Sequence, residues 1–134
     1  MTVSLRLLDT DIWIALARGE PGVARRLRSL DPAQVASCSV VRAELMFGAR
    51  KSQRVAENIE GFVRLLAPFV SLSFDDFAAG HYGLIRATLE RAGTPVGAND
   101  LLIASIALAH DCLLVTRNSR EFERIVGLRV ETWP

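Results

Sequence analysis

Acidic residues follow apolar segments at several places along the chain, in positions that suit metal-assisted chemistry. Asp9 comes directly after Leu5–Leu8, where three leucines in four residues predict a short buried strand. Glu44 lies in a helical segment after a second apolar stretch, and Asp100 begins a helix with almost nothing else polar. Glu121 lies in a short helical segment after a further apolar stretch. Because strand ends gather at one edge of a parallel sheet, we expect these acids to lie together.

Carboxylates that lie close together repel each other unless a cation sits between them. Oxygen ligands with no His or Cys nearby suit Mg²⁺ or Mn²⁺ better than Zn²⁺. The two histidines fall elsewhere, and His81 is expected to pack on an apolar stripe of its helix. Ions held by acids activate water and stabilise a phosphodiester transition state. We therefore predict one metal site with Mg²⁺ or Mn²⁺ as its cofactor, formed by Asp9, Glu44 and Asp100.

Polar neighbours of the acids are expected to support this site. Thr10 follows Asp9 directly, and Thr116 and Asn118 follow the fourth apolar stretch, with Glu121 one turn beyond Asn118 on the same side of a helix. We expect the catalytic set to consist of Asp9, Glu44, Asp100 and Glu121.

Each acid also has a purely structural interpretation. Asp9 or Asp11 could cap the helix that follows the first strand, and Asp100 could cap its own helix. Glu44 could be a paired or surface residue. Residues 116–121 could form a helix cap followed by a solvated Glu.

Strand-like and helix-like segments alternate along the chain. The apolar and β-branched patterns predict strands at 5–8, 35–41, 69–74, 112–116 and 128–130. Helical periodicity predicts helices at 12–17, 21–30, 39–48, 55–66, 75–93, 100–109 and 117–122. Ser39 and Asn99 are the expected N-caps of two of these helices. Alternation of this kind predicts an α/β fold with a parallel sheet and helices on both of its faces.

The composition fits one domain, residues 1–134, because half of the 134 residues are hydrophobic. A net charge of +1 excludes a polycation. Fifteen of the sixteen basic residues are Arg, which suits bidentate phosphate contacts, although biased base composition would give the same skew. The local Arg clusters could border the acids and grip a nucleic-acid backbone, or they could be solvated helix faces.

The chain carries the features of a cytoplasmic protein. Cys38 and Cys112 lie in apolar surroundings without metal-ligand spacing, so we expect reduced core residues. Residues 1–4 lack the pattern of a signal peptide. The longest apolar run, near 101–109, is too short to span a bilayer, so no membrane association is expected.

Four motifs in order resemble those of PIN-domain ribonucleases of the VapC type. They are the segments 7–13, 39–49, 96–104 and 114–122, the last followed by 127–133, and together they extend over nearly the whole chain. The resemblance implies a PIN-domain three-layer α/β/α sandwich with a central, mainly parallel sheet. It also implies a toxin of a type II toxin–antitoxin system, whose metal-dependent cleavage of RNA, plausibly tRNA, inhibits translation. The implied partners are a VapB-type antitoxin and a second copy of the chain, in a homodimer and a toxin–antitoxin hetero-oligomer.

The resemblance maps Asp9, Glu44 and Asp100 onto acidic residues of the family. Many relatives carry Asp where this chain has Asn118, so the neutral residue is a departure from the pattern. Glu121 could supply the missing charge. Asp11 could reach the acids only if its turn faces inward.

Other functions remain open at this stage. Asp9-Thr10-Asp11 has the Asp-x-Asp form of haloacid-dehalogenase-like phosphotransfer enzymes, and a receiver-like Mg²⁺-binding module also uses such acids. Both usually need a Lys near the phosphate, whereas Lys51 directly follows the helix of Glu44, before any later acid. A catalytically weak module that binds RNA or a protein partner is a third alternative, which the neutral Asn118 keeps open.

Overall fold

A five-stranded parallel sheet forms the centre of the molecule. The computed structural model describes residues 4–134. Most of the segment predicted to lack a signal-peptide pattern, residues 1–3, therefore lies outside the described residues. All strand pairings are parallel and the strand order is β3-β2-β1-β4-β5. The strands are β1 (Arg6–Leu8), β2 (Val35–Cys38), β3 (Val70–Leu72), β4 (Leu113–Thr116) and β5 (Arg129–Thr132). The prediction of an α/β fold with a parallel sheet is confirmed.

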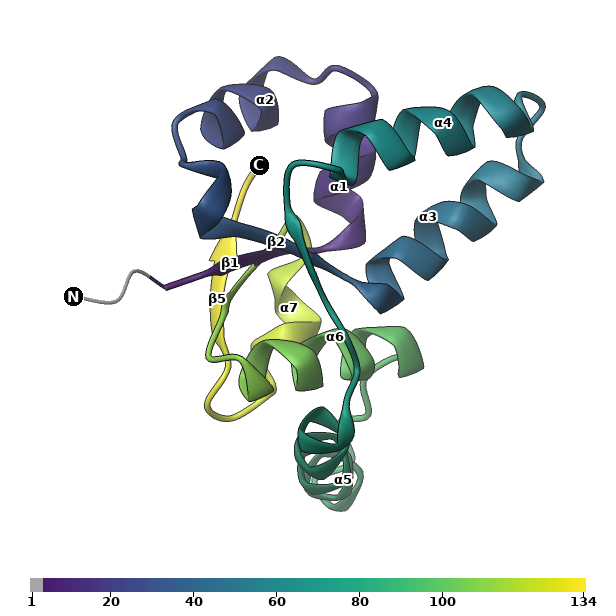
Figure 1. Cartoon of the computed structure of the whole chain (residues 1–134). Helices are drawn as coiled ribbons and strands as arrows, with labels where there is room; N and C mark the ends of the chain where they lie inside the picture. The colour runs from purple at the N-terminus through teal and green to yellow at the C-terminus, as the bar shows by residue number, and fades with distance from the viewer. Residues whose placement is uncertain (1–3) are drawn as a thin grey trace.

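Helices cover both faces of this sheet. In Figure 1, α1, α2 and α4 lie above it and α5, α6 and α7 below it. The helices are α1 (Thr10–Ala17), α2 (Pro21–Arg28), α3 (Ser39–Lys51), α4 (Val55–Leu66), α5 (Asp76–Arg91), α6 (Ala98–Ala109) and α7 (Ser119–Phe122), with a 3-10 helix η1 at Pro32–Gln34. Among residues 4–134, no helix has both the length and the apolar character needed to cross a membrane.

The strand order reverses direction between β1 and β4. From β1 the chain passes outward to β2 and β3, and then returns through α5 and α6 to place β4 on the other side of β1. Ligand crevices in open parallel sheets form at the carboxyl ends of the strands beside such a reversal. Asp9 follows β1 directly and Thr116 ends β4, so the topology places both residues at that position.

The hydrophobic core consists of side chains from the apolar segments identified in the sequence. Helix α6 is buried on nearly all sides, as predicted. Trp13 is fully buried, and its indole N–H donates to the Leu8 carbonyl at 2.9 Å. Cys38 and Cys112 are free and buried, as expected. Burial raises the pKa of both thiols to about 11, so neither is a ready nucleophile.

Several predicted boundaries are wrong. Strand β2 ends at Cys38 instead of residue 41, because Ser39 already begins α3. Cys38, whose backbone is extended, is the N-cap of that helix. Ser39 is therefore not the N-cap. Helix α6 begins at Ala98, which makes Gly97 the N-cap in place of Asn99. The Asn99 side chain instead donates to Glu44, a tertiary contact that replaces the local one.

The predicted apolar stripe on α5 is only partly in the core. Ile85 and Leu89 are buried, but Phe77 and Leu84 are 66% and 67% exposed. His81 is half-buried and lies edge-on to the ring of Phe77. The difference arises because α5 is an outer helix that packs chiefly on α6, so part of its apolar face has no neighbouring element.

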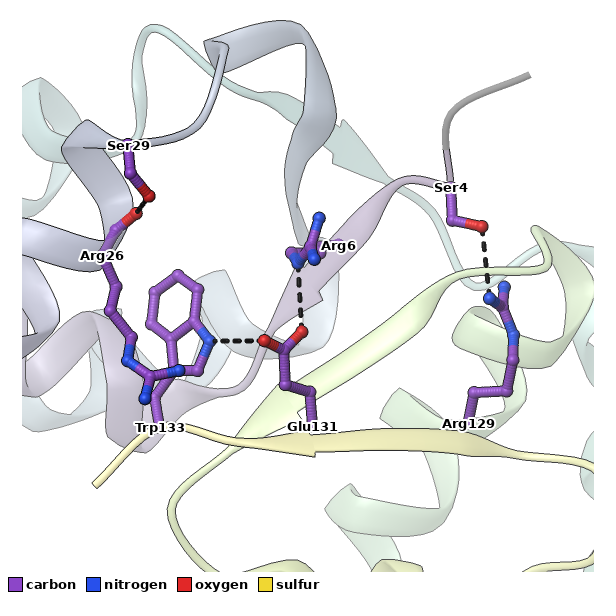
Figure 2. Close-up of polar contacts among 7 residues, drawn as sticks. All are labelled: Ser4, Arg6, Arg26, Ser29, Arg129, Glu131 and Trp133. Carbon is purple, nitrogen blue, oxygen red and sulfur yellow. Dashed lines mark hydrogen bonds and ion pairs between the residues drawn. The ribbon is translucent and has the colours of Figure 1, made fainter. Parts of the chain in front are cut away.

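The C-terminal segment is fastened to the sheet by a buried tryptophan. Trp133 is 2% exposed, and its indole N–H donates to Glu131 Oε1 at 3.3 Å. Arg6 Nε donates to the other carboxylate oxygen of Glu131 at 3.1 Å, and the Arg26 guanidinium lies 6.0 Å from the indole centroid. Figure 2 shows Glu131 between Trp133 and Arg6. The Trp133 backbone N–H donates to the Thr116 carbonyl at 3.1 Å, which joins this cluster to the end of β4.

Removal of the Trp133 indole should destabilise the whole molecule. We expect Trp133→Ala to lower the free energy of unfolding by about 3–5 kcal/mol, the usual cost of deleting a large buried aromatic side chain. Val126→Ala is the matched control, because Val126 is 85% exposed and its truncation should change stability by less than about 0.5 kcal/mol. Urea unfolding followed by circular dichroism measures both. A loss below about 1 kcal/mol for Trp133→Ala would mean that the C-terminal segment is not part of the cooperative unit.

Candidate active site

A cavity of about 290 Å³ opens at the carboxyl ends of β1 and β4, where the strand order reverses. Four carboxylates line it, from the start of α1, from α3 and from the first turn of α6, together with smaller polar and apolar groups. Its lining consists of Asp9, Thr10, Asp11, Ile14, Glu44, Asp100, Asn118 and Phe122. The acids predicted to meet at the sheet edge, Asp9, Glu44 and Asp100, thus lie around one cavity.

Asp9 serves both as a helix cap and as part of the cavity wall. Its Oδ1 accepts from the Thr10 backbone N–H at 2.8 Å, so it is the N-cap of α1. Its Oδ2 accepts from the Thr116 hydroxyl at 2.8 Å. Asp9 is 7% exposed, and burial, followed by the nearby charge of Asp11, raises its pKa to about 6. Asp9 therefore caps α1 and lines the cavity at the same time.

Glu44 connects the starts of two helices. Its Oε1 accepts from the Thr10 hydroxyl at 2.6 Å, and its Oε2 accepts from Asn99 Nδ2 at 3.3 Å. These donors lie at the start of α1 and the start of α6. Hydrogen bonds from uncharged donors fix the direction of the carboxylate and leave its charge in place.

The carboxyl groups of Asp100 and Glu121 perturb each other's pKa. Burial is the main cause that raises the pKa of Asp100 to about 8, and its hydrogen bond with Glu121 raises it further. The same hydrogen bond lowers the pKa of Glu121, as does the Gly97 backbone N–H, which donates to Glu121 Oε1 at 2.5 Å. The interaction between these two carboxyl groups thus moves their pKa values in opposite directions, upwards for Asp100 and downwards for Glu121. Glu121 is not part of the cavity lining and reaches the site through Asp100.

Asp11 lines the cavity, although the predicted set did not include it. Its Oδ2 accepts from the Arg117 backbone N–H at 3.0 Å and lies 3.3 Å from the Thr116 hydroxyl oxygen. Its Oδ1 is buried, and among the described residues it has no hydrogen-bond partner. The position of Asp11, two residues after Asp9, was the only signal for it in the sequence. The sequence does not show that the first turn of α1 faces the cavity.

Thr116 and Arg117 hold the opposite side of the cavity. Thr116 is fully buried, and its hydroxyl accepts from the Asn118 backbone N–H at 3.2 Å while donating towards the acids. Arg117 makes a two-pronged ion pair with Glu20, at 2.6 and 3.2 Å. The hydrogen bond with Glu20 is the main cause that raises the pKa of Arg117, and the charges of Glu20 and of the cavity acid Asp11 raise it further.

The donor set suits a hard divalent cation. Among residues 4–134 every ion pair joins Arg to an acid outside the cavity: Glu20, Glu57, Glu60, Glu90, Asp111 and Glu131. No cavity acid therefore makes a direct ion pair within the described part of the chain. No three His, Cys, Asp or Glu side chains in the described part of the chain form a preformed cage for an ion. Mg²⁺ does not require one, because it usually keeps several waters and uses one or two carboxylates plus substrate phosphates.

Comparisons with known proteins agree on one family. Residues 6–128 match the family model of the PIN domain. A curated relative from Shigella flexneri, the "tRNA(fMet)-specific endonuclease VapC", is 42% identical over 130 residues, covering 95% of this chain and 96% of the relative. The Salmonella typhimurium protein of the same description is 40% identical with the same coverage.

Solved structures give the same result. DNA-bound VapBC from Salmonella typhimurium contains a chain with a TM-score of 0.92 and 37% identity, covering 98% of this chain and 99% of that chain. VapBC2 from Rickettsia felis, bound to a DNA fragment from their promoter, has a TM-score of 0.91 and 33% identity, with 97% and 99% coverage. The chain therefore belongs to the PIN-domain family, in its VapC group. This membership confirms the resemblance and the α/β/α fold class, and it removes the haloacid-dehalogenase-like and receiver-like alternatives.

The stability of the metal-free protein should fall as pH rises. The folded-state pKa values of Asp9 and Asp100, about 6 and about 8, lie above the ordinary value of 3.8. The folded state therefore binds more protons than the unfolded state across that window, and this contribution to stability is lost as pH rises through the folded pKa values. For Asp9 the shift corresponds to roughly 3 kcal/mol. We expect the melting temperature in EDTA to decrease steadily between about pH 5 and about pH 8.5.

Two variants serve as controls for this measurement. Asp100→Asn should flatten the decrease in its upper part, because it removes the group that titrates highest. Asp76→Asn, at an exposed acid in the first turn of α5, should leave the curve unchanged. Identical curves for the wild type and Asp100→Asn would contradict the raised pKa of Asp100.

Proposed function

We propose that this chain is the toxin component of a type II toxin–antitoxin system, a metal-dependent endoribonuclease that inhibits translation by cleaving RNA. The observation that carries this proposal is the cavity with four carboxylates and no paired protein cation among the described residues. Membership of the VapC group, whose curated members are named ribonucleases, supports it. PIN-domain ribonucleases generally depend on a divalent metal ion. The specific proposal is Mg²⁺ or Mn²⁺.

The proposed roles follow from the contacts of each residue. Asp9, Glu44 and Asp100 would hold the ion. When bound, the ion would activate water and stabilise charge on the scissile phosphate. Thr10 and Thr116 orient the carboxylates of Glu44 and Asp9 through their hydroxyl groups, and Asn118 fixes the turn after β4 through its backbone bond to Thr116.

The substrate and partners are proposed from the relatives. Two curated relatives are named tRNA(fMet)-specific, so tRNA is the proposed class of RNA. Solved structures of similar chains are VapBC complexes, so we propose a VapB-type antitoxin as partner, within a homodimer and a toxin–antitoxin hetero-oligomer. We further propose that residues 1–134 act as one PIN domain in the cytoplasm, without a membrane.

Loss of one cavity charge should abolish cleavage without unfolding the protein. Asp9→Asn, Glu44→Gln and Asp100→Asn each remove a charge with little change in volume. We expect each to lower the rate of tRNA cleavage by about 100-fold or more, the scale of a lost electrostatic contact in a catalytic site. The measurement is cleavage of total tRNA in Mg²⁺ or Mn²⁺ and in EDTA, beside growth after induced expression.

The activity of the wild-type protein distinguishes the proposed ribonuclease from the remaining alternative, a catalytically weak binding module. A wild-type protein that cuts no RNA with either ion, and does not slow growth, would support a catalytically weak module that binds RNA or a protein. Full activity of Asp100→Asn would remove that residue from the proposed site.

Glu121 should act as a positioning residue for Asp100. We expect Glu121→Gln to reduce cleavage by about 10- to 100-fold, the usual effect of losing a partner that orients a metal ligand. The reason is that the neutral amide interacts less strongly with the Gly97 N–H and with Asp100. Glu123→Gln is the control, because Glu123 lies two residues further on and is exposed. Equal rates for Glu121→Gln and Glu123→Gln would make Glu121 a surface residue without a role in the site.

A further inference from the structure

A second cavity, of about 270 Å³, lies between α5 and the start of α6, and we call it the α5–α6 cavity. In Figure 1, α5 lies below α6. Three buried apolar side chains contribute to its lining, Leu89, Val96 and Leu101. Tyr82 and Arg86 of α5 also line it. It shares no lining residue with the cavity that contains the acids, and the proposed roles above do not use it.

Tyr82 and Arg86 present two planar groups in fixed positions. Arg86 Nη1 donates to the Tyr82 hydroxyl at 2.8 Å, and the guanidinium carbon lies 5.9 Å from the centroid of the tyrosine ring. Glu90 Oε1 lies 3.5 Å from Arg86 Nε, and the ring of Phe74 is edge-on to Tyr82 at 6.1 Å. Each planar group is therefore held by a neighbour before any ligand arrives.

This combination of side chains suits a nucleobase. Unpaired bases of RNA stack on aromatic rings and on arginine planes, and such stacking tolerates any base. The apolar part of the lining can exclude water from the faces of a flat heterocycle. Glu90 also lines the cavity, and its carboxylate can accept a hydrogen bond from the amino group of a base.

The α5–α6 cavity lies close to the proposed cleavage site. Ala98 and Leu101 line it, whereas Asp100, in the same turn of α6, lines the cavity that contains the acids. An α-helix with its side chains is about 10–12 Å across. A strand whose phosphate lies at the acids therefore passes only one turn of helix to place a neighbouring base in the α5–α6 cavity.

We infer that the α5–α6 cavity binds an unpaired base of the RNA substrate near the cleavage point, by stacking on Tyr82 and Arg86. This inference rests on the proposed cleavage of RNA. Neither side chain lines the cavity of the acids, so both bind substrate and take no part in the chemical step. Their loss should therefore raise KM for RNA more than it lowers kcat.

Binding of a single-stranded RNA tests this inference. The probe is a labelled strand of mixed sequence, about twelve nucleotides long. Every protein carries Asp100→Asn, so that the RNA is bound and not cut, and fluorescence anisotropy in Mg²⁺ gives the affinity. We expect Tyr82→Leu to weaken binding by about 5- to 100-fold, because it removes the stacking surface. Tyr82→Phe keeps the ring and should stay within about threefold of the parent protein.

A strand of the same length without bases separates stacking from contacts with phosphate. Tyr82→Leu should bind this abasic strand as tightly as the parent protein does. Arg86→Gln should weaken binding of the normal strand more than Arg64→Gln, which removes the same charge from an exposed position on α4 and should stay within about twofold. If Tyr82→Leu does not fold, this comparison of arginine variants decides: equal losses overturn the inference.

The remaining outcomes distinguish the inference from the proposed function. Equal affinities of Tyr82→Leu and its parent for the normal strand, beside a wild type that cuts tRNA, would overturn the inference and leave the proposed function intact. A nucleoside monophosphate that binds as tightly as the strand would assign the cavity to a free nucleotide and also overturn it. A wild type that neither binds nor cuts RNA would overturn both.

Discussion

The structure depends on holding like-charged carboxylates close together at one edge of a sheet. Repulsion would drive such groups apart if their side chains were free to move. Asp9 and Glu44 are each held by a threonine hydroxyl from another element, Thr116 for Asp9 and Thr10 for Glu44. A hydroxyl donates one hydrogen bond and carries no charge. These contacts therefore give the cavity a fixed shape and leave its negative charge available to a ligand.

The support for these contacts extends far from the cavity. Thr116 ends β4, and its carbonyl accepts from the backbone N–H of Trp133, next to the end of the chain. Trp133 is buried and bonded to Glu131, which is paired with Arg6 on β1. The C-terminal cluster of Figure 2 thus joins β1, β4 and β5, the strands beside the reversal of strand order. The backbone contact between Trp133 and Thr116 therefore links this cluster to the wall of the cavity.

The parts of the site that were predictable are those that follow from position along the chain. Asp9 and Asp100 line the cavity because parallel strands and their crossover helices bring such positions to one edge. The inward direction of Asp11 was not predictable, because it depends on contacts with residues more than 100 positions away. The exposed Phe77 on α5 shows a related limit: periodicity identifies residues that share a helix face, but not whether another element covers that face.

The distribution of ion pairs distinguishes this acidic cavity from a structural charge network. In a structural network, arginines would lie among the acids and neutralise them. Here the arginine closest to the cavity along the chain, Arg117, pairs its guanidinium with Glu20 and donates its backbone N–H to Asp11. The other described ion pairs also involve acids outside the cavity. A domain with a net charge of +1 therefore keeps a local excess of negative charge at one place. Burial of the Asp9 carboxylate is unfavourable for folding by itself, and the proposed binding of a cation from solution would offset this cost.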